Sequence, residues 1–150
     1  MELSYQEKSI LGSLLAMVLV YGYYFAAALR HVTEPEFGSG SLGRLIFTVI
    51  AIVAIEIVYH IVLAIEQKPE AKDERDILIE GRAYRNAYFL MATGAFLVIN
   101  YVIVASLMRD AAPTRILITP SLMVNLILLA MVAGELTKYG SQLFYYRRGF

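Results

Sequence analysis

The chain has 150 residues, of which 59% are hydrophobic and 17% charged, and this apolar share is too high for an ordinary soluble domain. Its formal net charge of zero gives no field that attracts nucleic acid, so no direct nucleic-acid binding is expected. The chain lacks cysteine, which excludes disulfides and thiolate metal sites, and it contains no phosphate-binding, dinucleotide, G-x-S-x-G or H-E-x-x-H motif.

Four apolar runs approach the roughly 20 residues that cross a hydrocarbon core about 30 Å thick. They cover residues 9–29, 45–65, 87–108 and 116–136. Because they use more than half of the chain, little remains for a separate soluble domain. We therefore predict that residues 1–150 form one all-α domain, a polytopic four-transmembrane-helix bundle in a lipid bilayer.

The first run reads as a retained helix, because its N-terminus is not basic and more spans follow. Ser4-x-x-Glu7 predicts a capping box at its start. Gly12-xxx-Ala16 places small residues on one face, where another helix can approach closely. The next stretch, residues 31–44, is rich in Gly, Ser and Pro and predicts a flexible outer loop.

The second run contains ionisable residues close to its middle. Glu56 lies near mid-span, His60 follows at i+4 on the same face, and Tyr59 is a neighbour. A carboxylate at mid-bilayer costs about 2.5–3.5 kcal/mol on insertion scales, so Glu56 needs a partner or a proton. Asn100 and Asn125, on the third and fourth runs, fall at comparable depth and would share a polar interior with Glu56 if the polar faces meet.

Three interpretations of these polar residues remain open. In the first, they are interhelical hydrogen-bonding groups that hold the bundle together. In the second, Glu56, His60, Tyr59, Asn100 and Asn125 form a proton- or ligand-binding pocket. In the third, Glu56 and His60 bind a divalent metal; these two ligands are half of a site, so a symmetric homodimer would have to supply the rest.

The second connection, residues 66–85, contains the most distinctive local sequence. Asp73-x-x-Asp76 predicts a helix start with acidic residues in the first turn. If the helix begins there, Asp73, Asp76 and Glu80 share one side. They would suit a cation, the basic C-terminal residues or a cytoplasmic regulatory partner; the alternative is a solvated helix turn beside the membrane.

The last run has two alternative starts and a basic end. Either Thr119-Pro120 opens the helix, or an earlier start at Ile116 carries a kink. Glu135 and Lys138 at i, i+3 predict a local ion pair. The aromatic and basic residues 145–148 suit the headgroup region.

The distribution of Lys and Arg predicts the orientation. Nine of the thirteen fall in the N-terminal, central and C-terminal segments, against four in the two outer loops. Because cytoplasmic segments carry the excess of basic residues, both termini and the central connection are predicted to be cytoplasmic.

The motif Asp73-Glu74-Arg75-Asp76-x-x-Ile79, followed by a basic-aromatic start to an apolar span, resembles a family of small prokaryotic membrane proteins grouped as a domain of unknown function. The resemblance covers mainly the central connection and the third run. It implies a polytopic protein of the prokaryotic plasma (inner) membrane, in some cases encoded near a helix-turn-helix regulator. It implies no reaction and no site residues.

Two functions follow as hypotheses. The first is a non-catalytic membrane protein of regulatory, signalling or immunity type, whose acidic residues face a partner. The second is a small proton- or metal-coupled transporter or channel that uses Glu56 and His60. An enzyme is less expected, because the sequence offers no nucleophile and base in a recognisable pattern.

Overall fold

The protein is all-α in a computed structural model that describes residues 4–31, 38–68, 71–108 and 118–148. Its long helices are α1 (Tyr5–Ala28), α2 (Ser39–Glu66), α3 (Glu74–Met108) and α4 (Pro120–Arg148). All four are long and apolar enough to cross a membrane, which confirms the predicted all-α class and the expected number of long apolar helices. α3, with 35 residues, is about 50 Å long and exceeds a bilayer core of about 30 Å.

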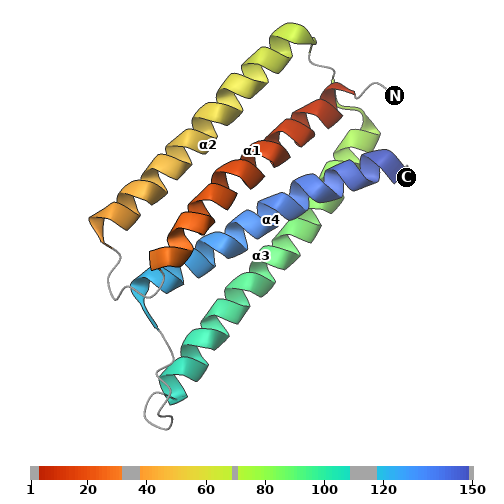
Figure 1. Ribbon diagram of the computed structural model, residues 1–150. Helices are drawn as coiled ribbons and strands as arrows, with labels where there is room; N and C mark the ends of the chain where they lie inside the picture. Colours follow the sequence, from red (N-terminus) through yellow and green to blue (C-terminus); the bar gives the residue numbers. More distant parts are fainter. Residues whose placement is uncertain (1–3, 32–37, 69–70, 109–117, 149–150) are drawn as a thin grey trace.

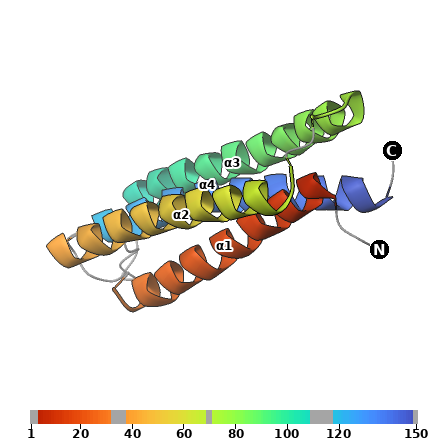
Figure 2. The ribbon, with the colours of Figure 1, turned by 90° about the horizontal axis from the view of Figure 1, so that it is seen from above.

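The helices run alternately up and down and pack in the order α2, α1, α4, α3 (Figure 1). The largest contact joins α3 to α4, and smaller contacts join α1 to α4 and α1 to α2. Both views place α4 between α1 and α3 (Figure 2). The start of α1, the end of α2, the start of α3 and the end of α4 lie at the same end, which we call the termini end; the other is the opposite end (Figure 1).

The predicted helix starts are confirmed where the structure describes them. Ser4 and Glu7 form a reciprocal capping box at α1. Asp73 and Asp76 exchange backbone-to-carboxylate hydrogen bonds of 3.1 and 2.7 Å at the start of α3. Thr119 accepts a hydrogen bond from the backbone N–H of Leu122 beside Pro120, so the first of the two predicted starts of α4 applies.

Two predicted connections are shorter than expected. α2 begins at Ser39, inside the stretch predicted as a loop, because Gly38 accepts the first helical hydrogen bonds and the apolar residues after it continue the helix. α3 begins at Glu74, inside the connection predicted over residues 66–85, because the capping pair at Asp73 and Asp76 stabilises its first turn. The residues of the first half of α3 are therefore rigidly placed at the termini end.

Small residues set the close contacts between helices. A Cβ on Gly94 would lie 2.7 Å from the Cβ of Ala130, and one on Gly134 would lie 3.2 Å from that of Met91. α3 and α4 therefore approach too closely for larger side chains at these positions. A Cβ on Gly12 would overlap the ring of Tyr59, so the predicted close approach at Gly12 is confirmed for α1 and α2.

Candidate functional site

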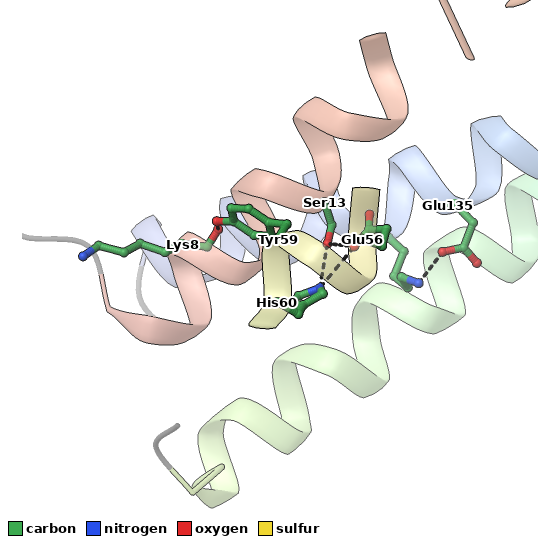
Figure 3. A network of polar contacts seen from close by, with 7 residues as sticks. Lys8, Ser13, Glu56, Tyr59, His60 and Glu135 are labelled. Carbon is green, nitrogen blue, oxygen red and sulfur yellow. Dashed lines mark hydrogen bonds and ion pairs between the residues drawn. The ribbon is translucent and has the colours of Figure 1, made fainter. Parts of the chain in front are cut away.

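Three polar side chains from two helices meet between α1 and α2 (Figure 3). The Ser13 hydroxyl donates a 2.7 Å hydrogen bond to Oε2 of Glu56, and Nε2 of His60 lies 3.1 Å from the same oxygen. Ser13 Oγ also lies 3.3 Å from His60 Nε2. Ser13 is 2% exposed, whereas the side chains of Glu56 and His60 are 23% and 41% exposed. We call these three residues the Glu56 cluster.

The predicted pairing of Glu56 with His60 is therefore present, and Ser13 is an additional member that sequence reasoning missed. The i, i+4 spacing on α2 is sufficient to predict the pair. Ser13 lies on α1, next to Gly12 at the close contact of the two helices. This glycine and serine on one small-residue face are the only signal that pointed to Ser13.

Tyr59 holds the two helices of the cluster together. Its hydroxyl donates a 2.6 Å hydrogen bond to the backbone carbonyl of Lys8, and its ring covers Gly12. The sequence proposed Tyr59 as a ligand- or proton-binding residue. Its hydrogen bond and its ring contact both join α2 to α1 beside the Glu56 cluster (Figure 3).

A cavity of about 240 Å³ opens at the termini end and reaches the Glu56 cluster. Its wall is mainly polar and combines residues of all four helices and of the connection before α3, among them Ser13, His60, Lys72, Glu80, Tyr84 and Lys138. We call it the termini-end cavity. Because typical drug-binding pockets measure about 300–1,000 Å³, its size suits a small solute or ordered water.

A second acid–base pair lies on α4. Lys138 donates a hydrogen bond to Glu135, as the i, i+3 spacing predicted. The Lys138 ammonium also lies over two aromatic rings, 4.3 Å from the ring centre of Tyr139 and 5.3 Å from that of Tyr84. The Lys138 side chain is 11% exposed, so its charge is held mainly by these neighbours.

The two acid–base pairs lie at a similar depth. By helical rise, Glu56 is about 25 Å from the start of α2 and Glu135 about 22 Å from the start of α4. In each pair the base is one turn nearer the termini end, and α1 packs between the two helices. The base of each pair, His60 on α2 and Lys138 on α4, lines the termini-end cavity.

The acidic residues of α3 have partners inside the molecule. Asp76 accepts a 2.7 Å hydrogen bond from the hydroxyl of Tyr146, and Glu80 forms a 2.7 Å ion pair with Lys72. Arg75 contacts the backbone carbonyl of Tyr146 at 3.5 Å. The proposed partner-binding residues Asp76 and Glu80 thus line the cavity, while Asp73 is exposed at the cap. Residues 145–148 continue α4 as a helix.

The two predicted asparagines make hydrogen bonds within their own helices. Asn100 donates to the carbonyl of Phe96, and Asn125 donates to that of Ser121, each at 2.8 Å. Asn125 lies beside Arg44 at a cavity of only about 10 Å³ at the opposite end, and its Oδ1 is buried without a hydrogen-bond partner. The residue of another helix that bonds Glu56 is therefore Ser13, and neither of the two asparagines that the sequence suggested.

The metal hypothesis has two of its ligands in place, since Glu56 and His60 point to the same position. Among the described residues, no group of three or more His, Cys, Asp or Glu side chains could hold a metal ion.

Comparison of the chain with protein-family models, curated proteins and solved structures finds no match. The functional interpretation therefore rests on the geometry of the side chains.

Proposed function

We propose that this protein is a small, non-catalytic, multi-pass plasma-membrane transporter or channel that conducts protons across the membrane through Glu56 and His60, alone or together with a solute. The observation that carries the proposal is the Glu56 cluster, in which one carboxylate oxygen of Glu56 lies within hydrogen-bond distance of both the Ser13 hydroxyl and the His60 imidazole. Ser13 and His60 line the polar cavity. Ionisable residues inside spanning helices are costly and typically mark proton or substrate pathways.

The cluster can exchange a proton with the cavity. Histidine is the side chain that changes charge most readily near neutral pH, and His60 lines the cavity. Glu56 lies behind it and accepts hydrogen bonds from Ser13 and His60. A proton that arrives on His60 from the cavity therefore reaches Glu56 over one hydrogen bond.

The distribution of Lys and Arg supports a cytoplasmic termini end, so the cavity would open to the cytoplasm. At the opposite end, the cavity beside Arg44 holds about 10 Å³, against about 240 Å³ at the termini end. This asymmetry is what an inward-open transporter requires. α2 packs chiefly against α1 and leaves an apolar face for lipid or for a second copy, which supports a homodimer.

The geometry gives less support to the two other functions. Ser13 is buried and its hydroxyl proton is donated to Glu56, so it is poorly placed to attack a substrate. Asp76 and Glu80 are bound by Tyr146 and Lys72, so a cytoplasmic regulatory partner would have to compete with these contacts.

The test uses purified protein in liposomes that contain a pH-sensitive dye, with an imposed pH gradient and a clamped membrane potential. We expect proton flux with the wild-type protein and at least about a tenfold loss with Glu56→Gln. Glu66→Gln, the same change at an exposed position of α2, is the matched control and should retain flux. Absence of wild-type flux, or equal flux in both variants, would refute the proposal.

A further inference from the structure

The wall of the termini-end cavity already stabilises an ammonium group. Lys138 places its ammonium against the Glu135 carboxylate and over the rings of Tyr84 and Tyr139. A carboxylate combined with aromatic faces is the arrangement that proteins use to recognise organic ammonium ions. Because the Lys138 side chain is a flexible four-carbon chain, its ammonium can leave this position without a backbone change.

The charge around the cavity also favours a cation. Among the described residues, four carboxylates line the cavity or bond a side chain that does, against two ammonium groups that line it and the guanidinium of Arg75, which contacts the lining residue Tyr146; His60 adds a positive charge only when it is protonated. The carboxylates are those of Glu56, Asp76, Glu80 and Glu135, and the ammonium groups are those of Lys72 and Lys138. A cationic solute would balance this excess of negative charge, whereas an anionic solute would increase it.

We propose that the termini-end cavity binds a small organic ammonium compound, and that its ammonium takes the position of the Lys138 ammonium between Glu135, Tyr84 and Tyr139. Lys138 is then a tethered competitor that occupies the site when the solute is absent. This inference rests on the proposed function only for the coupling to protons, because binding of an amine can be measured without a gradient.

The experiment is calorimetric titration of the purified full-length protein in detergent. The probe is n-butylammonium, the free counterpart of the lysine side chain, and butyrate is the control of equal size and opposite charge. We expect saturable binding of n-butylammonium and none of butyrate. Lys138→Met removes the competitor but keeps the length of the side chain, so affinity should rise about tenfold. Glu135→Gln should lower it by a similar factor.

Opposite effects of the two substitutions distinguish a binding site from a structural ion pair, whose partners would act in the same direction. If Glu135→Gln does not fold, Tyr139→Leu should weaken amine binding while Tyr139→Phe, which keeps the ring, should not. Equal binding of butyrate, or affinity changes of one sign in Lys138→Met and Glu135→Gln, would overturn the inference. If amine binding is absent but proton flux is present, the inference fails and the proposed function is retained. If proton flux is absent but amine binding is present, the proposed function fails and the ammonium site is retained.

Discussion

The two acid–base pairs of the molecule have the same plan but different bases and surroundings. Glu56 and His60 are partly exposed, His60 lines the cavity, and their only interhelical partner in the cluster is Ser13. Glu135 and Lys138 combine an ion pair with two aromatic rings, and Lys138 is nearly buried. An imidazole loses its charge near neutral pH, whereas an ammonium keeps it. We therefore propose different roles for the two pairs, proton exchange for Glu56 and His60 and cation binding for Glu135 and Lys138.

The largest expected effect comes from breaking the lysine pair. Glu135→Gln leaves the nearly buried Lys138 ammonium without its carboxylate; because the Glu135 side chain is 46% exposed, we expect a loss of about 1.5–3 kcal/mol, the range for a hydrogen bond to a charged group. Glu56→Gln should cost less than about 1 kcal/mol, because the amide can still accept the hydrogen bond from Ser13. Reversible unfolding in mixed micelles measures both. Equal losses would show that the two pairs do not differ in this way.

The next effect comes from separating the helices that carry the histidine pair. Gly12→Ala displaces the Tyr59 ring and its hydrogen bond to Lys8, so we expect a loss of about 2 kcal/mol and a weaker proton flux. Gly22→Ala is the control in the same helix, since nothing lies within 4 Å of its added Cβ, and it should be neutral or slightly stabilising. A Gly12→Ala protein as stable as the control would contradict the role given to Tyr59.

A third experiment replaces the histidine of the first pair with lysine, so that both pairs combine a glutamate with a lysine. His60→Lys keeps a base beside Glu56 but replaces the imidazole, which can both accept and donate a proton, with an ammonium group, which can only donate. We expect proton flux to fall about tenfold, a change of about 1.4 kcal/mol in the barrier, while the thermal midpoint changes little. The liposome assay and a thermal scan of the same preparation measure the two quantities. Unchanged flux would show that the imidazole is not part of the proton path.

The local features of both pairs could be predicted from the sequence, and their long-range partners could not. Spacing along one helix is enough to pair Glu56 with His60 and Glu135 with Lys138. Ser13 and Tyr84 join these pairs only because α1 packs on α2 and α3 packs on α4. Each helix is apolar on most of its faces, so the pattern does not mark the face that meets a neighbour.

The same limit explains the two asparagines. Asn100 and Asn125 fall at suitable depths, but depth does not determine which helices are neighbours, and α2 packs chiefly against α1. The close contacts at Gly12, Gly94 and Gly134 decide the neighbours. The partner of Glu56 is therefore Ser13, which lies beside the close contact at Gly12, and not an amide at mid-depth.

The smallest effect is expected at a polar residue that has no basic partner. Asn125 keeps a buried Oδ1 without a hydrogen bond, and its Nδ2 bonds only the carbonyl one turn earlier in α4. Asn125→Leu has a similar volume and removes the cost of burying this oxygen, so we expect a change of less than about 1 kcal/mol, in the stabilising direction if any. Unfolding in mixed micelles, run beside Glu135→Gln, provides the measurement. A loss as large as that of Glu135→Gln would mean that Asn125 contributes as much as a charged pair, and that buried polar groups here stabilise the fold without a base beside them.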